Sequence, residues 1–209
     1  AMTLPKMQTV TGSIRLQGED KDLVILETVV NNTTPGAGTY YIDNVTATYF
    51  GENTSGGQTF TAFSSSNGNT IFLSNVAFKS PEYEKLHYRN FASAGNNGAI
   101  YVEDGCSIEG LITSAFSGSG GACYIRYNCT INGNIRSGTT QYACALALNS
   151  GKVLLARPNS NYEHPVLSGN LIGRRYYGNL NSIFTTPDGS VTAFPGTVDG
   201  TLLTGAQYT

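Results

Sequence analysis

Three carboxylates that lie close together in the sequence are the first residues whose chemistry could define a function. They are Glu103, Asp104 and Glu109. Two carboxyl groups that face each other across a groove can cleave a glycosidic bond. Glu103 also has a structural partner in Arg126, and Asp104-Gly105 is typical of a corner in the chain. Because proximity is the only argument for catalysis, we assign no catalytic residue.

Tyrosines with polar neighbours offer a second chemistry, the binding of sugars. The apolar C–H face of a sugar ring packs on an aromatic ring, while its hydroxyls bond to Asn, Asp, Arg and His. The candidate glycan-binding residues are Tyr101, Tyr124, Arg126, Tyr162, His164, Arg174, Tyr176 and Tyr177. The alternative is that these side chains fill a subunit interface, where Tyr and Arg are also enriched.

The cysteines do not predict a metal site. None of the four belongs to a C-x-x-C pair, and both histidines, His87 and His164, lie outside the cysteine cluster, so we expect no metal and no cofactor. We interpret the cysteines as small core side chains because they alternate with apolar residues. A disulfide would need side chains that approach each other, and stacked side chains point in parallel. The cysteines are Cys106, Cys123, Cys129 and Cys144.

A repeat of 23 residues indicates the elements that position these side chains. Residues 98–102 (GAIYV) return as residues 121–125 (GACYI), and residues 106–112 (CSIEGLI) return as residues 129–135 (CTINGNI); 121 − 98 and 129 − 106 both equal 23. A fixed period with alternating apolar residues and a Gly at each corner is typical of stacked coils in a solenoid. The alternation predicts strands with one buried face.

The repeat also predicts which side chains stack. Outward residues of successive coils should lie above one another, with Tyr101 on Tyr124 and Glu103 beside Arg126. Opposite charges in adjacent strands stabilise the pairing, by about 0.2–1 kcal/mol. The expected inward pairs are Ile100/Cys123, Val102/Ile125, Cys106/Cys129, Ile108/Ile131 and Ile112/Ile135.

The N-terminal part, residues 1–80, is interpreted as irregular coils of the same solenoid. Asn44-Val45 recurs as Asn75-Val76, 31 residues later (75 − 44). A separate β-sandwich is the competing interpretation. Residues 80–88 give the only helix prediction, with Ser80 as its cap and Pro81 at its first position. The N-terminal Ala1-Met2 resembles the remnant of a tag in front of a fragment, with no signal peptide after it.

The C-terminal part, residues 156–209, loses the repeat. Regular coils are predicted over residues 97–155, so the β-helix spans 1–155. The remainder is rich in Tyr, Gly, Asn and Pro and is predicted to be an irregular β/loop cap and trimer-contact segment, because an open solenoid end must be covered. Its prolines include Pro158, Pro165, Pro187 and Pro195.

Composition limits the partners. The chain has 209 residues, of which only 12% are charged, with 25 Gly, 13 Tyr and a formal charge of −2. The absence of a basic stripe makes nucleic acid an unexpected partner. The sequence contains no run of about 20 apolar residues, so it predicts no membrane span.

The chain resembles the distal parts of bacteriophage tailspikes and tail fibres. The resemblance rests on the coil pair 98–112 and 121–135, which looks like rungs of a right-handed parallel β-helix, on the Asn-Val pairs at Asn44 and Asn75, and on the Gly/Tyr/Asn-rich residues 168–179. It implies an all-β fold, a right-handed parallel β-helix (β-solenoid), and a homotrimer on the virion tail or otherwise extracellular.

The resemblance also implies a function. Such proteins bind, and sometimes cleave, bacterial surface polysaccharide. Because no catalytic motif of the family can be placed on this chain, only the binding role is carried over, and the expected partners are a bacterial surface polysaccharide and further copies of this chain. The alternatives are a polysaccharide lyase or glycoside hydrolase on the same scaffold, a structural fibre segment, and a bacterial surface adhesin.

Overall fold

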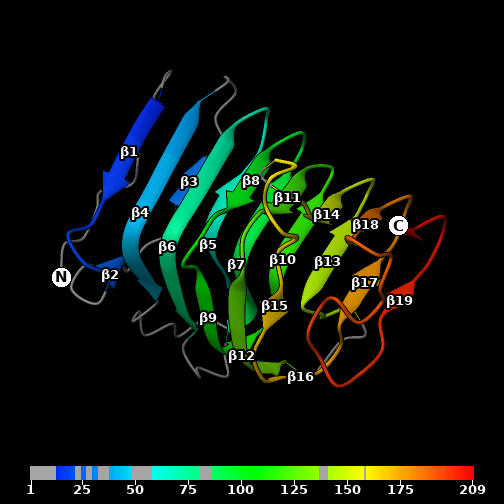
Figure 1. Cartoon of the computed structure of the whole chain (residues 1–209). Helices are drawn as coiled ribbons and strands as arrows, with labels where there is room; N and C mark the ends of the chain where they lie inside the picture. The colour runs from blue at the N-terminus through cyan, green and yellow to red at the C-terminus, as the bar shows by residue number, and fades with distance from the viewer. Residues whose placement is uncertain are drawn as a thin grey trace.

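The computed structural model describes residues 13–21, 25–26, 30–32, 38–48, 58–80, 86–136, 141–157 and 159–209. In this part of the chain all regular structure is β, and every pairing between named strands is parallel. Two sheets run side by side along the molecule, from β1 near the N-terminus to β19 and β20 near the C-terminus (Figure 1). This arrangement of stacked coils is compatible with a β-helix or solenoid.

The larger sheet, called sheet A here, has thirteen strands. Its early strands β4 and β6 are long, and each pairs with two shorter strands. β4 pairs with β1 and β2, and β6 pairs with β8 and β9. The strands are β1 (Ser13–Gln17), β2 (Ile25–Leu26), β4 (Thr39–Thr48), β6 (Thr70–Ser80), β8 (Ala99–Val102), β9 (Ser107–Ile112), β11 (Ala122–Ile125), β12 (Cys129–Ile135), β14 (Lys152–Leu155), β15 (Leu167–Ser168), β16 (Leu171–Ile172), β18 (Ile183–Thr185) and β20 (Gln207–Tyr208).

The smaller sheet, sheet B, has seven strands. Each of its strands lies in the chain between two strands of sheet A, so in every coil the chain leaves sheet A, forms one strand of sheet B and returns to sheet A. The strands are β3 (Val30–Asn32), β5 (Gln58–Ser65), β7 (Leu86–Gly95), β10 (Ser114–Ser119), β13 (Ala145–Leu148), β17 (Tyr176–Gly178) and β19 (Thr201–Leu202).

The predicted stacking of the repeat is confirmed. In the register of β8 with β11, Tyr101 lies opposite Tyr124, and Ile100 opposite Cys123. The register of β9 with β12 pairs Ile108 with Ile131 and Ile112 with Ile135. All four cysteines are buried and free, as expected of core side chains. Their burial raises the pKa of each thiol, to about 12 for Cys106 and Cys123.

The described N-terminal strands belong to the same sheets as the repeat. β4 pairs in parallel with β6 at a spacing of 31 residues, as Thr39 with Thr70, and this favours irregular coils over a separate sandwich. Asn44 and Asn75 share one corner with positive φ values of 56° and 49°. The Asn75 side-chain nitrogen donates to the Asn44 side-chain oxygen at 2.5 Å. Gly105, with φ 73°, continues this corner into the next coil.

One expectation differs from the structure. The helix over 80–88 is wrong where the structure can test it, because Ser80 ends β6 and residues 86–88 begin β7; residues 81–85 lie outside the described part of the chain, as do Ala1 and Met2. The described residues after 155 form short strands between loops, and β17 and β19 extend sheet B while β18 and β20 extend sheet A. Parallel pairing continues there without a sequence repeat because backbone groups make it. None of the described residues forms a helix long and apolar enough to cross a membrane.

Candidate functional site

Four aromatic side chains stack on the outer face of sheet A, and we call them the aromatic ladder: Tyr41, Phe72, Tyr101 and Tyr124. They occupy equivalent positions in β4, β6, β8 and β11. Their ring centroids lie 5.1, 4.8 and 4.7 Å apart along the row, and successive ring planes are within 11° of parallel. The strand spacing of a parallel sheet sets these distances, so the backbone holds the rings in line.

The stacking decides what the ladder offers to a ligand. Each ring covers the face of its neighbour, so the ladder presents ring edges and tyrosine hydroxyls in place of free ring faces. The ring of Tyr124 is half-buried, and burial raises the pKa of its hydroxyl. The hydroxyl is therefore neutral at physiological pH and can both donate and accept a hydrogen bond.

Arg126 lies beside the ladder and connects two of the predicted residues. Its guanidinium donates to Glu103 Oε1 at 2.8 Å, and its Cζ lies 5.5 Å from the centroid of the Tyr101 ring. The predicted Glu103–Arg126 pair between adjacent coils is thus confirmed. Partial burial raises the pKa of Glu103, and the charge and hydrogen bond of Arg126 oppose this rise. Cation–π and ionic contacts hold Arg126 against the sheet.

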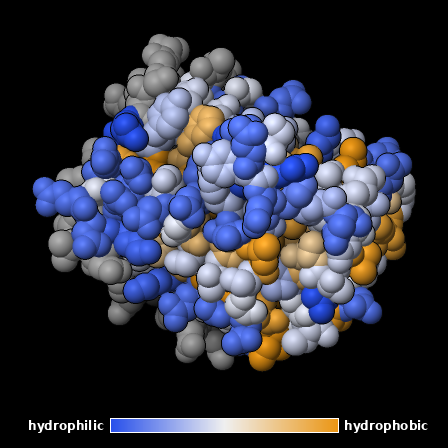
Figure 2. Space-filling view, viewed as in Figure 1, coloured by the Kyte–Doolittle hydropathy of each residue, from blue (hydrophilic) through white to orange (hydrophobic). Residues whose placement is uncertain are grey.

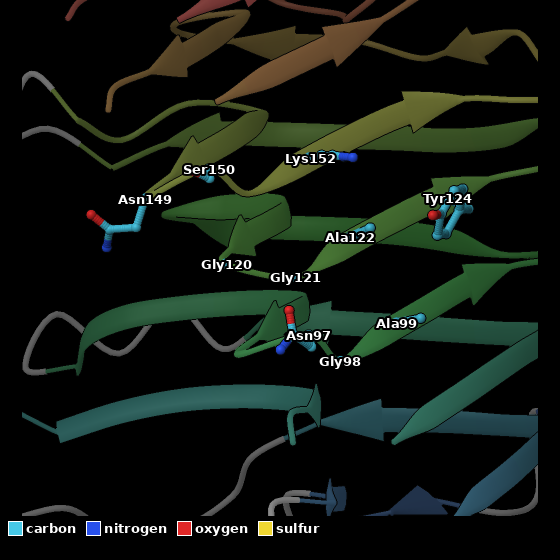
Figure 3. Close-up of a pocket in the computed structure, with 10 residues that line it drawn as sticks. All are labelled: Asn97, Gly98, Ala99, Gly120, Gly121, Ala122, Tyr124, Asn149, Ser150 and Lys152. Carbon is cyan, nitrogen blue, oxygen red and sulfur yellow. The ribbon is translucent and has the colours of Figure 1, made fainter. Parts of the chain in front are cut away.

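A hollow lies next to the ladder because one turn is shorter than its neighbours. Ser119 pairs with Gly95 and with Leu148, and Ala122 pairs with Ala99 and with Lys152. Three residues connect these positions in the adjacent coils, 96–98 and 149–151, but only two, 120–121, do so here. Figure 3 shows the Gly120-Gly121 turn between the turn at Asn97 and the turn at Asn149 and Ser150.

We call this hollow the notch; its volume is about 590 Å³. Its base is made of small residues, Gly98, Ala99, Gly120, Gly121 and Ala122. Its polar groups come from Asn97, Tyr124, Asn149, Ser150 and Lys152. Among the described residues, its lining thus includes one ammonium, two amides and two hydroxyls, and no carboxylate. Tyr124 belongs to both the notch and the ladder, so the two form one continuous surface.

Sequence reasoning found Tyr101, Tyr124 and Arg126 but missed the notch. The available signal was a turn of two glycines, Ser119-Gly120-Gly121-Ala122, where the preceding coil has Gly95-Asn96-Asn97-Gly98-Ala99. The repeat begins at Gly98 and Gly121, after the missing residue, so the alignment of the repeat did not include the difference in length.

The tail candidates do not join this surface as a group. Tyr162 is exposed and packs edge-on against Tyr127, with ring centroids 5.8 Å apart. Arg174 is half-buried and donates to the Thr201 hydroxyl at 3.1 Å. Tyr176 and Tyr177 are only 8% and 4% exposed. A buried ring has no face for a sugar, so we leave both tyrosines out of the candidate site.

His164 lies in a second hollow of about 330 Å³, together with Pro165, Pro187 and Asp188. Its Nδ1 is buried and meets no hydrogen-bond partner within the described part of the chain. The proline side chains and buried Leu167 make this hollow more apolar than the notch. It is separate from the notch, because the two share no lining residue.

The carboxylates do not form a catalytic pair in the described structure. Glu103 is held by Arg126, and Asp104 Oδ1 accepts a hydrogen bond from the Gly105 backbone N–H at 2.9 Å. Glu109 is exposed and lies in register with Lys79 of β6. Among the described His, Cys, Asp and Glu residues, no group of three or more could hold a metal ion.

Comparison with models of protein families, with curated proteins and with solved structures finds no match for this chain.

Proposed function

We propose that this chain is a right-handed parallel β-helix from the distal part of a phage tail fibre or tailspike, and that it binds a bacterial surface polysaccharide during host adsorption. The observation that carries the proposal is the continuous surface of the ladder and the notch. It combines tyrosine hydroxyls and an ammonium on parallel strands with the amides of Asn97 and Asn149 on the adjacent turns. Polysaccharides are recognised through such polar groups next to apolar surface.

The geometry of the ladder suits an extended polymer. Its rings recur with the strand spacing over four coils, and three of the four, all but Phe72, carry a hydroxyl, so a chain of sugar residues that lies along the helix axis meets similar contacts at most steps. Each contact is weak by itself, because a hydrogen bond that exchanges with water contributes about 0.5–1.5 kcal/mol. Several contacts on one rigid strip add up, since the sheet is already ordered before the ligand binds.

Adsorption to cells tests this proposal. The purified protein should adsorb to cells of particular bacterial strains and to their isolated surface polysaccharide. Tyr124→Ala should weaken binding about tenfold or more, by the loss of one hydroxyl and one ring edge. The matched control is Thr185→Ala, because Thr185 continues the same outward row beyond the ladder, as Leu154 pairs with Thr185. Absence of adsorption to any strain, or equal loss in both variants, would contradict the proposal.

We further propose that the chain assembles as a homotrimer. Seven of the eight exposed large hydrophobic side chains among the described residues lie between 162 and 203. Figure 2 shows hydrophobic surface towards the C-terminal strands on the face in view. Light scattering should give about three times 22.2 kDa. Ile172→Asp with Val166→Asp should lower the mass, because these two side chains are 60% and 61% exposed, and a charge in an apolar interface is costly.

An enzyme on the same scaffold, a polysaccharide lyase or glycoside hydrolase, is the second candidate. The raised pKa of Glu103 is the feature that favours it, because a general acid must hold its proton. Release of reducing sugar from the polysaccharide, abolished by Glu103→Gln and Glu109→Gln while binding persists, would support the enzyme. Binding without release, unchanged in both variants, would support the binding protein.

A further inference from the structure

We propose that the notch binds a carboxylated sugar residue, a uronic acid unit of the polysaccharide, and that the Lys152 ammonium pairs with its carboxylate. This inference rests on the proposed function and names the class of sugar that the site selects. The charge of the notch, its shape and its position beside the ladder all favour such a ligand.

The charge of the notch favours an anion. Lys152 is exposed and is the one ionised side chain among the lining residues that the structure describes. The two ion pairs found among the described residues are Arg15–Asp43 and Glu103–Arg126, so Lys152 takes part in neither of them. An ammonium without a carboxylate partner, at the edge of a hollow, attracts a ligand carboxylate. A neutral sugar would leave this charge unused.

The other polar groups favour a sugar over a simple anion. Asn97 and Asn149 carry amides that both donate and accept hydrogen bonds, and Ser150 and Tyr124 carry hydroxyls. Donors and acceptors around one cation match a ring that bears several hydroxyls and one carboxylate. A phosphate or acetate ion offers mainly hydrogen-bond acceptors, and its contact area is smaller than that of a sugar ring.

The notch is already formed in the free protein. A Cβ added at Gly121 would lie 2.7 Å from the Gly98 carbonyl oxygen and 2.8 Å from the Ala94 carbonyl carbon. The short turn is therefore packed directly on the backbone of the preceding coil and has no room to move inward. On the other side, the Asn149 side-chain nitrogen donates to the Ser119 hydroxyl at 3.3 Å. A pre-formed hollow reduces the ordering cost of binding.

Its size and position suit one residue of a longer chain. The volume of about 590 Å³ falls in the range of about 300–1,000 Å³ typical of ligand pockets. Because Tyr124 ends the ladder and also lines the notch, a polymer along the ladder can place one sugar residue in the notch. The notch thus selects the sugar type, and the ladder adds affinity along the chain.

Titration of the full chain with three small probes, followed by NMR, tests the inference. The probes are glucuronate, glucose and acetate. Glucuronate should bind with the notch resonances shifting, and about tenfold more tightly than glucose or acetate, because only glucuronate meets both the ammonium and the amides. Equal affinity for acetate would indicate a simple anion site, and equal affinity for glucose would indicate a neutral sugar site; either result overturns the proposal.

Variants of Lys152 test the charge. Lys152→Gln should weaken glucuronate binding about three- to tenfold, the range for a partly exposed charged contact, and should leave glucose unchanged. Lys152→Arg should retain most of the affinity. The matched control is Lys79→Gln, because Lys79 is also exposed but lies in register with Glu109, away from the notch. Equal effects of Lys152→Gln and Lys79→Gln would contradict the assignment.

An insertion tests the shape. One asparagine inserted between Ser119 and Gly120 restores the three-residue turn of the adjacent coils, so the fold should persist while the notch is filled. Glucuronate binding should then be lost, with unchanged thermal unfolding as the control. If the insertion variant unfolds, Ala122→Leu fills the notch from an outward position in its place, with Thr70→Leu as the control in the same row. Unchanged binding in a folded, filled variant overturns the proposal.

The two proposals fail differently. If the intact protein adsorbs to cells but glucuronate does not bind, only the choice of sugar is wrong. If the intact protein adsorbs to no cells and binds no polysaccharide, the proposed function itself is wrong.

Discussion

The aromatic residues inside the coils are arranged differently from those outside. One inward row of sheet B alternates large and small side chains at equivalent positions: Phe63, Ala92, Phe116, Ala145 and Tyr176. The outward row of sheet A instead has an aromatic ring in four successive coils. Inside, rings also meet edge to face, as Phe63 and Phe91 do at 85°.

The difference follows from the space available. The interior has a fixed volume between two sheets and must be filled without voids, so a ring in one coil leaves room only for a small residue in the next. The exterior has no opposite wall, so flat rings can stack at the strand spacing coil after coil. The same residue type is thus structural in one row and available to a ligand in the other.

The largest expected effect is a difference in the free energy of unfolding between a substitution in the inward row of sheet B and one in the aromatic ladder. Tyr176→Ala should cost about 3–5 kcal/mol, because it removes a buried ring that packs on Phe184 and Tyr208, with centroids 5.4 and 4.9 Å away. Tyr101→Ala should cost about 1–3 kcal/mol, the sum of two stacked pairs at the surface. Urea unfolding of both variants, with Tyr101→Phe as the control, measures this. Equal costs would mean that the ladder is as structural as the core.

Alkaline pH should destabilise the interior before the ladder, because a cysteine thiol ionises at a lower pH than a tyrosine hydroxyl. Burial raises the pKa of Cys106 and Cys123 from about 9 to about 12. The raised folded-state pKa means that this stability is fully present below pH 9 and is lost as the pH rises from 9 to 12, because the unfolded thiols ionise first. Each of these two thiols should lower the unfolding free energy by about 1.4 kcal/mol per pH unit in that window.

Denaturant unfolding between pH 8 and 10.5 measures this slope, and Cys123→Ala should reduce it. In the native protein at pH 8 the four thiols should also resist alkylation until denaturant is added, since all are buried. Rapid labelling without denaturant would show that the inward rows open to solvent.

Substitution at the Asn75 corner should lower the free energy of unfolding by a smaller amount. Asn75→Ala should cost about 1–2 kcal/mol, because it removes the hydrogen bond to Asn44 and places alanine at positive φ. Asn75→Gly should cost less than Asn75→Ala, because glycine accepts positive φ without strain. Thermal unfolding of both variants gives the comparison. Equal costs would mean that the side-chain bond alone matters, because both variants lack it.

The smallest effect is expected for the ion pair beside the ladder. A double-mutant cycle with Glu103→Gln and Arg126→Gln should give a coupling of about 0.2–1 kcal/mol, as for pairs near the surface, which falls with added salt. A coupling of several kcal/mol would show that this exterior pair is as structural as the interior rows.

The repeat in the sequence was enough to predict the register of the central coils. Residues two apart in a strand face the same side, so the 23-residue alignment by itself predicts that Tyr101 stacks on Tyr124 and Ile108 on Ile131. The same rule predicted the Glu103–Arg126 pair. It did not extend the ladder to Tyr41 and Phe72, because the spacing between stacked residues changes from 23 in the repeat to 29 between Phe72 and Tyr101 and to 31 between Tyr41 and Phe72.

The sequence by itself thus determined the strand type, the inward cysteines and the central register, because each depends on alternation over a few residues. Only the tertiary structure decided that residues 156–209 add further strands to both sheets, that Tyr176 and Tyr177 are buried, and that a two-residue turn at Gly120 and Gly121 leaves the notch. Each of these depends on which coil lies beside which. Backbone pairing between coils makes that choice, and it leaves no mark on local residue types.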